Sequence, residues 1–396
     1  MNLKEEISRL AKAYKDEFVE IRRYLHANPE LSYKEVETCR YVKGQLESMG
    51  IEPKQIGGTG LVAIIRGNNP ESRVIALRAD MDALPINEEN SHLSYKSTKA
   101  GIMHACGHDA HTAILLGASK ILYETRNYWD GTVKLIFQPG EEKNPGGATY
   151  MIRDGALQDP APEGIVALHV HPNLEVGRVS FRKGTVMASA DELYITIKSK
   201  GGHAAAPQLT ADTILVASHL VVSLQQIISR NNHPLNPSVL SITSFQGGHT
   251  TNVIPSEVKL MGTLRCLDET WRSKAHELII RHVTHIAEAM GADATIHIDK
   301  GYPTVLNNPE LTGNAWALTE DYLGKEMVEE TEMRMGAEDF GYYAQLLPGC
   351  FYRLGVMNEE KGITSGVHTP TFQIDEDSIE VGMGTMAWLG AKLIMD

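Results

Sequence analysis

Apolar residues recur along the chain with two different periods. In residues 3 to 27 they repeat every three or four positions, which predicts an amphipathic helix that ends at "ANPEL". Short β-branched runs bounded by Gly and Pro then predict strands, and one longer apolar stretch, 111–126, predicts a helix. The strands are expected at 58–67, 72–85, 131–142 and 162–172. Strand–helix–strand alternation indicates an α/β domain with a largely parallel sheet.

The pattern changes after residue 184. Polar and apolar residues alternate, as in half-buried strands, at 190–201, 238–248, 256–268 and 293–301. Helical stretches at 209–230 and 270–290 separate them, so the order is β-α-β-β-α-β, which is typical of a ferredoxin-like α+β unit. A helix at 309–323 and an apolar run at 348–356 resume the first pattern. We therefore expect a domain formed by 1–184 and 300–396, interrupted by an inserted domain at 185–299, in a chain of 396 residues that is too long for one core.

Charge and composition exclude several partners. A net charge of −13 and the lack of a Lys/Arg cluster argue against a nucleic-acid partner. No run approaches the roughly 20 apolar residues of a membrane span, and the charged first segment lacks the apolar core of a secretory signal. The four cysteines are far apart and form no CxxC pair, which indicates a reducing compartment. We expect a cytoplasmic protein that binds neither nucleic acid nor a membrane.

Potential ligand residues follow the strands of the first domain. Asp80 and Asp82 follow one strand, Glu141 and Glu142 the next, and His169 and His171 a third. Cys106 and His108 open the helix at 111, and His368 precedes another apolar piece near the C-terminus. Because the carboxyl ends of parallel strands meet at one edge of a sheet, these residues can converge. Thiolate, imidazole and carboxylate are the ligands of Zn, Mn, Fe, Co and Ni.

Simpler interpretations compete with a metal site. A lone loop histidine is more often structural than ligating, and adjacent loop glutamates are usually a solvated pair. Cys106 with His108 could also be a cysteine nucleophile and its base. Spacing alone does not decide among these possibilities.

A series of motifs resembles the M20 metallopeptidases, in order, from about residue 20 to residue 385. The motifs are "RRYLHANPEL", "ALRADMDALP", "MHACGHDAHTAILLGA", "LIFQPGEE", "GGATYMIRDGAL", "GGHAAAP", "TTNVIPSEVKLMGTLR", "GAEDFGYY" and "HTPTF". They are most similar to the branch of N-acyl-amino-acid amidohydrolases, hippurate hydrolase and plant auxin-conjugate hydrolases. The resemblance implies a zinc-exopeptidase-like α/β/α catalytic domain interrupted by a ferredoxin-like lid.

The resemblance also implies a ligand set for two divalent metal ions, with Mn, Zn, Co and Ni all open. Cys106 would bridge the ions, His108 and His169 would complete one site, and Glu142 and His368 the other. Glu141 would be the general acid/base. In most other M20 branches a His-x-Asp stands where this chain has Asp80-Met81-Asp82, and an aspartate forms the bridge. This departure leaves the role of Asp80 open, and Asp82 is expected to orient a ligand.

The inserted domain carries three further expectations from the resemblance. His203, in "GGHAAAP", would donate to the oxyanion, reaching the site of a neighbouring subunit. Asn252 and Arg265 would hold the substrate carboxylate. A homodimer or homotetramer through the lid is therefore expected. His26, Pro29 and Glu30 belong to a recognisable motif, but helix termination and packing are sufficient to explain them.

The expected function is binuclear metal-dependent hydrolysis of an N-acyl-L-amino acid or related conjugate, giving a carboxylate and a free amino acid. A dipeptidase or carboxypeptidase of the same fold is an alternative, as is a cysteine amidase using Cys106. A non-enzymatic regulator on this fold is a further alternative, against which the intact Glu141 and full ligand set argue.

Overall fold

The computed structural model describes residues 2–394, which divide into two compact units. The first contains residues up to Gly184, Leu306–Glu332 and the chain from Asp339 onward; the second contains Thr185–Val305 and Met333–Glu338. None of the described helices is long and apolar enough to cross a membrane.

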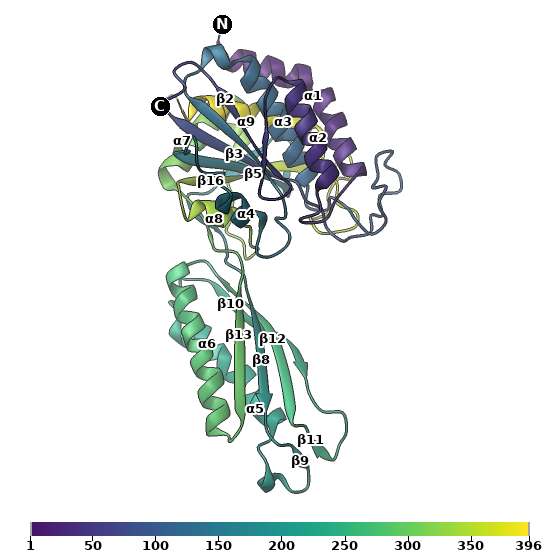
Figure 1. Ribbon diagram of the computed structural model, residues 1–396, viewed down its shortest axis with the longest axis vertical. Helices are drawn as coiled ribbons and strands as arrows, with labels where there is room; N and C mark the ends of the chain where they lie inside the picture. Colours follow the sequence, from purple (N-terminus) through teal and green to yellow (C-terminus); the bar gives the residue numbers. More distant parts are fainter. Residues whose placement is uncertain (1, 395–396) are drawn as a thin grey trace. The chain divides into compact units, whose positions relative to one another are not determined.

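The first unit is built on an eight-stranded sheet (Figure 1). Its order is β1-β2-β4-β3-β5-β16-β6-β15. The strands are β1 (Lys54–Ile56), β2 (Gly60–Arg66), β3 (Val74–Asp80), β4 (Thr132–Gln138), β5 (Gly164–Glu175), β6 (Val179–Phe181), β15 (Val328–Glu330) and β16 (Gly349–Met357). The central strands β4, β3, β5 and β16 are parallel, whereas β2 and β6 flank them antiparallel. The sheet is therefore mixed, and the largely parallel arrangement expected from the sequence holds only for its centre.

The helices of the first unit pack against the sheet and against one another. The helices of this unit are α1 (Leu3–Ala27), α2 (Val36–Ser48), α3 (His108–Glu124), α4 (Gly147–Arg153), α7 (Pro309–Leu323), α8 (Phe340–Ala344) and α9 (Asp377–Lys392). Helices α1, α3 and α9 pack against one another and contribute to one hydrophobic core with the sheet. All residues of β4 are buried, which requires cover on both faces of the sheet. This α/β architecture agrees with the predicted fold class.

Helix α3 begins earlier than predicted. The expected start at residue 111 is wrong, because the helix begins at His108 and takes in Asp109. Gly107 precedes it with φ +87°, a conformation that favours glycine. A Cβ atom at Gly107 would lie 2.6 Å from Val170 Cγ2. Backbone conformation and close packing therefore both require glycine at the turn between Cys106 and His108.

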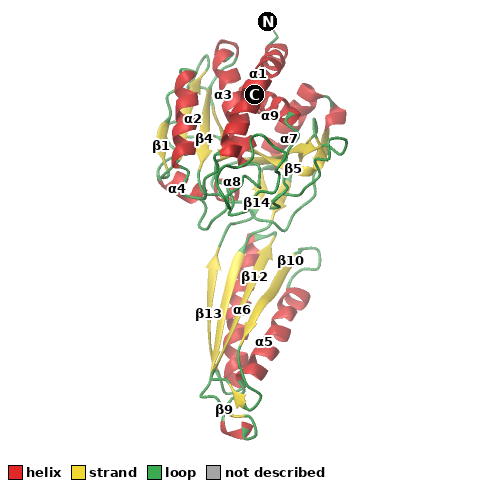
Figure 2. Ribbon diagram, turned by 90° about the vertical axis from the view of Figure 1, so that its right-hand side faces the viewer, coloured by secondary structure: helices red, strands yellow, loops and turns green. Residues whose placement is uncertain are grey.

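The second unit is the predicted β-α-β-β-α-β lid (Figure 2). Its antiparallel strands lie in the order β10-β12-β8-β13. They are β8 (Asp191–Lys198), β10 (Ser238–Gln246), β12 (Glu257–Cys266) and β13 (Asp293–Lys300). Helices α5 (Thr213–Gln226) and α6 (Glu269–Ala289) pack together on the sheet around a separate hydrophobic core. A short ribbon pairs β9 (Gly202–His203) with β11 (Val253–Ile254).

The lid extends a few residues beyond the expected boundary at 299/300. Arg272 donates to the Gly301 carbonyl over 3.0 Å, and the Ala190 amide donates to the Tyr302 carbonyl over 3.0 Å. The Thr304 amide donates to Glu269 Oε1 over 2.8 Å. These bonds tie the chain after β13 to the lid up to Val305.

Candidate metal centre

The register of three parallel strands aligns the candidate residues at one edge of the sheet. Asp80, the last residue of β3, pairs with Gln138, the last residue of β4. Arg78 of β3 pairs with Ala167 of β5, so that Asp80 lies level with His169 two residues further along. The carboxyl ends of β3, β4 and β5 thus converge from segments that are distant in sequence.

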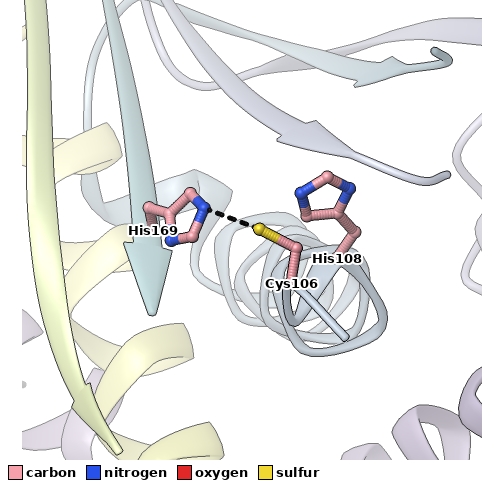
Figure 3. Close-up of side chains that lie close together, drawn as sticks. All are labelled: Cys106, His108 and His169. Atoms are coloured by element: carbon pink, nitrogen blue, oxygen red, sulfur yellow. Dashed lines mark hydrogen bonds between the residues drawn. The ribbon is translucent and has the colours of Figure 1, made fainter. Parts of the chain in front are cut away.

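Figure 3 shows the Cys106 side chain between those of His169 of β5 and His108 of α3. Its Sγ atom is 3.4 Å from His169 Nε2 of β5 and 3.3 Å from His368 Nε2 of the loop after β16. Cys106, His108 and His169 form one group whose potential ligand atoms all lie within 4.8 Å of one another. Cys106, Glu142 and His368 form a second such group. The two groups share the cysteine, as the sequence-based hypothesis of a bridging Cys106 requires.

Two histidines are oriented by their other ring nitrogens. His169 Nδ1 donates to the Val170 carbonyl over 2.8 Å, which leaves a lone pair on Nε2 toward Cys106. His108 Nδ1 lies 3.2 Å from Asp82 Oδ1, so that Nε2 faces the site. Asp82 also accepts from Ser32 Oγ and from the backbone amide of Glu142. It therefore holds two candidate ligand residues in place.

Asp80 and His111 have a role that the sequence did not reveal. His111 Nε2 accepts from the Val170 amide over 2.9 Å, so its proton is on Nδ1, which lies 2.6 Å from Asp80 Oδ1. Arg78 Nη1 donates to Asp80 Oδ2 over 2.6 Å. Both nitrogens of His111 are thus occupied by protein partners. Burial alone would raise the pKa of Asp80, but His108, Arg78 and His111 hold it well below its ordinary value of 3.8.

The surroundings of His108 suit a cation. Burial alone would lower its pKa, but the carboxylates of Asp80, Asp82 and Glu142 raise it to about 10. Its Nε2 atom and Glu142 Oε1 are buried, and neither has a hydrogen-bond partner among the described residues. These two atoms lie 3.9 Å apart. Buried potential ligand atoms that lack a hydrogen bond, surrounded by several carboxylates, fit a bound divalent cation.

The Cys106 side chain is a thiol unless a cation is bound beside it. Burial and the neighbouring Glu142, Glu141 and Asp80 carboxylates raise its pKa well above its ordinary value of 9.0. Its neighbour His169 is also neutral, because burial and the nearby His111 and Arg353 lower its pKa well below 6.5. A coordinated metal removes the thiol proton outright. All four cysteines are unpaired, so Cys106 is not part of a disulfide.

The two glutamates after β4 take different positions. Glu142 is grouped with Cys106 and His368, and its Oε1 lies 3.3 Å from His368 Nε2. Glu141 is buried, with an exposed fraction of 6%, and lies in a third group with His108 and Glu142. The loop is pinned at Gly140, whose amide donates to Glu35 Oε1 over 2.8 Å. The backbone amides on both sides of Glu141, those of Gly140 and Glu142, are therefore fixed by hydrogen bonds. Such a fixed backbone suits a residue whose side chain must be held close to a reacting atom.

The lid separates the residues expected to contact substrate. His203 and Val253 pair across the β9–β11 ribbon, and the Ala204 amide donates to the Asn252 carbonyl, so that His203 and Asn252 lie together. Arg265 lies near the opposite end of β12 from Glu257. Its Nε donates to Thr263 Oγ1 over 3.2 Å, and burial lowers its pKa. The structure therefore groups His203 with Asn252 but not with Arg265.

Comparison with known proteins places this arrangement in a family. Residues 76–389 match the peptidase family M20/M25/M40. The chain belongs to the M20 family. Thermostable carboxypeptidase 2 of Saccharolobus solfataricus is 39% identical over 396 residues, covering 99% of both chains. An N-acyl-L-amino acid amidohydrolase of Geobacillus stearothermophilus is 42% identical over 308 residues, covering 78% of this chain and 82% of the relative.

A solved M20 structure matches nearly the whole chain. It is the YXEP protein of Bacillus subtilis, a dinuclear metal-binding peptidase, with 34% identity and a TM-score of 0.84. The match covers 97% of this chain and 99% of the other. The resemblance seen in the sequence motifs is thereby confirmed, and the chain is an M20 hydrolase with a dinuclear metal-binding homologue.

Proposed function

We propose that this protein is a binuclear metal-dependent amidohydrolase that cleaves N-acyl-L-amino acids into a carboxylate and a free amino acid. The observation that carries the proposal is the pair of ligand groups that share Cys106, with the buried Glu141 beside them. In this proposal Cys106, His108 and His169 hold one ion, and Cys106, Glu142 and His368 hold the other. Mn, Zn, Co and Ni all suit a mixed thiolate, imidazole and carboxylate set.

Two divalent ions at this position would polarise the amide carbonyl and make water a stronger acid. The protein itself then has to move a proton. Glu141 accepts the proton of the attacking water and delivers it to the leaving nitrogen, which departs as an amine. Asp82 keeps His108 oriented throughout by accepting from its Nδ1–H.

The relatives support an amide substrate with a free carboxylate. One is named an N-acyl-L-amino acid amidohydrolase and another a carboxypeptidase. Both names describe cleavage next to an amino acid with a free carboxylate. Carboxypeptidase activity is the second candidate function, because the relative of that name is similar over 99% of this chain.

The electrostatics of Cys106 argue against a cysteine nucleophile. A nucleophilic cysteine needs a lowered pKa and a positively charged neighbour. Here the pKa of Cys106 is raised and His169, 3.4 Å away, is neutral. The thiol gains its negative charge only with a cation beside it, which favours a ligand.

The lid favours a site completed by a second copy of the chain. Ser189 donates its amide to the Cys266 carbonyl, so that Arg265 lies where the chain enters the lid. The ribbon with His203 and Asn252 lies beyond the far end of β12, and eight strand residues alone span about 27 Å. One lid therefore presents Arg265 and His203 at separate places. A dimer in which Arg265 comes from one subunit and His203 with Asn252 from the partner unites them.

Apolar side chains on the lid surface support such a dimer. Val222 of α5 is 73% exposed and Phe245 of β10 is 43% exposed. Strand β10 is also an edge of the lid sheet, with unpaired backbone groups. A second lid packed on α5 and β10 would cover both features.

A substrate panel tests the proposed function. The purified protein, loaded in turn with Mn²⁺, Zn²⁺, Co²⁺ or Ni²⁺, is assayed with N-acetyl and N-benzoyl amino acids, N-blocked dipeptides and the corresponding amides without a free carboxylate. We expect cleavage of N-acyl amino acids and little cleavage of the amides. Preferential cleavage of N-blocked dipeptides would favour a carboxypeptidase, and equal cleavage of substrates with and without a carboxylate would contradict the assigned substrate class.

A further inference from the structure

We propose that a buried network of Arg22, His26, Glu88 and Asp109 positions the metal-binding turn. This inference rests on the proposed function, because it concerns the same ligands. The network fixes the first turn of α3, and through it Cys106 and His108, in the geometry that binds the cations. His26 is then a positioning residue, although helix termination and packing were sufficient to explain its motif in the sequence.

The network joins three distant segments of the chain. His26, near the end of α1, places Nδ1 2.8 Å from Asp109 Oδ2 and Nε2 3.1 Å from Glu88 Oε1. Arg22, one turn earlier, places Nε 2.7 Å from the same Asp109 oxygen. Asp109 is 83 residues from His26, and Glu88 is 62 residues away. The start of α3 is therefore tied to α1 and to the loop that carries Glu88.

The ionisable side chains of this network are costly to bury. All four residues are buried, with exposed fractions of 3% or less. Both ring nitrogens of His26 face carboxylate oxygens, and Nδ1 also lies 3.2 Å from Arg22 Nη2. An arginine, a histidine and two carboxylic acids have thus been removed from water. Apolar residues of similar volume often give equal or greater stability at such sites, so packing alone does not account for these buried groups.

Asp109 connects this network directly to the ligands. It follows His108 and lies three residues after Cys106. The helix cap between them, Gly107, has no side chain that could hold the turn. Asp109 is the acidic residue in the first turn of α3, and Arg22 and His26 hold its carboxylate in place. A shift of Asp109 would therefore displace both His108 and Cys106.

Glu88, at the end of the network away from α3, is also held by hydrogen bonds. Glu88 Oε2 accepts from the Ser97 amide over 2.7 Å, and Glu88 Oε1 accepts from Asn90 Nδ2 over 3.2 Å. His26 thus lies between a carboxylate fixed by a loop and a carboxylate that belongs to the metal-binding helix. This arrangement transmits the rigidity of the surrounding domain to the ligands.

The lid contains a matched network without metal ligands. Asp191 accepts from Arg272 Nη2 over 2.5 Å and lies 2.7 Å from His276 Nε2. Asp191, Arg272 and His276 are therefore a buried Asp–Arg–His cluster in the other compact unit, with the same residue types as Asp109, Arg22 and His26. Asp191→Asn is the control for the general effect of damaging a buried Asp–Arg–His network.

The experiment compares the Zn²⁺ affinity of full-length Asp109→Asn, His26→Gln and Asp191→Asn with that of the unaltered protein. Affinity is measured by competition with a chromophoric chelator, and unfolding by chemical denaturation of the metal-free proteins. We expect Asp109→Asn and His26→Gln to bind Zn²⁺ about 10–100-fold more weakly. Asp191→Asn should lose comparable stability and keep its affinity within about twofold. With Co²⁺ in place of Zn²⁺, the thiolate-to-metal absorption of Cys106 should weaken or shift only in the first two variants.

The outcomes are distinct. Unchanged Zn²⁺ affinity and Co²⁺ spectra in both network variants would overturn the inference while leaving the proposed function intact. Equal loss of affinity in Asp191→Asn would also overturn it, because general destabilisation would then explain the effect. If Asp109→Asn does not fold, His26→Gln decides by the same criteria. Failure of the unaltered protein to bind Zn²⁺ would instead contradict the proposed function.

Discussion

At the scale of single residues, the clearest division of labour is between Glu141 and Glu142. Both follow β4, yet Glu142 faces Cys106 and His368 while Glu141 is buried beside them. We predict that Glu141→Gln keeps both metal ions and the folded structure but lowers kcat by about 10²–10⁴, because glutamine retains the size and loses the basicity. Metal analysis and steady-state kinetics on an N-acyl amino acid check this prediction.

Glu142→Gln is the matched control, with the same chemical change one residue away. It should lose metal, since an amide oxygen is a weaker ligand than a carboxylate. Near-normal turnover by Glu141→Gln would remove the general-base assignment. Loss of metal from both variants to the same degree would show that the two glutamates do not have separate roles.

Cys106 provides a second test at this scale. We predict that iodoacetamide, added at alkaline pH so that part of the free thiol ionises, labels Cys106 slowly in the metal-loaded protein and faster after chelation, because a coordinated thiolate is shielded. Peptide mass spectrometry measures the labelling, and the buried Cys350 serves as an internal reference away from the candidate ligands. Equal labelling rates for Cys106 with and without chelator would rule out its role as a ligand.

The sequence revealed the candidate metal ligands better than the residues that position those ligands. Cys106, His108, Glu142, His169 and His368 are brought together as the motifs indicated. The role of Asp80 remained open because it depends on contacts between distant segments. Asp80 pairs with His111 of α3, and the other ring nitrogen of His111 accepts from the Val170 amide of β5. The role proposed for His26 was hidden for the same reason, since Asp109 is 83 residues away. Such contacts depend on strand register and helix packing, which local patterns do not contain.

At the scale of elements, hydrophobic periodicity predicted most strands and helices but not their directions. The runs at 58–67 and 131–142 became β2 and β4, which pair antiparallel within a sheet expected to be largely parallel. Strand direction depends on the route of the connections, and apolar residues mark burial in either direction. The alternation in the lid was more informative, because β8 and β13 each have a more buried face and a more exposed face.

The lid network gives a prediction for the pH dependence of stability. Burial alone would raise the pKa of Asp191, but its hydrogen bonds with His276 and Arg272 lower it below the ordinary value of 3.8. A lowered pKa in the folded state stabilises the protein above pH 3.8, and this contribution is lost as the pH falls through the lowered value. Asp191→Asn should therefore lower the free energy of unfolding near neutral pH, and its difference from the unaltered protein should shrink below pH 3.8. Denaturant unfolding at several pH values measures this difference; a constant difference across that range would contradict it.

At the scale of the whole molecule, the proposed dimer predicts complementation between subunits. Mixing His203→Ala with Glu141→Ala subunits should give about a quarter of full activity, because half of the dimers are hybrids and each hybrid has one complete site. Mixing Glu141→Ala with Glu142→Ala subunits is the control and should restore nothing, since both residues serve the same subunit's site. A fully active monomer in sedimentation, or no activity in the first mixture, would contradict the proposed assembly.

The central claim is that two metal ions held by these ligands carry the hydrolysis. It is tested most directly by titrating the chelator-treated protein with Mn²⁺ or Zn²⁺ while measuring cleavage of an N-acyl amino acid and the number of ions bound per subunit. We predict negligible activity without metal and a plateau at two ions per subunit, with no covalent acyl-enzyme detectable by mass spectrometry. Full activity in the metal-free protein, or an acyl group trapped on Cys106, would contradict the account.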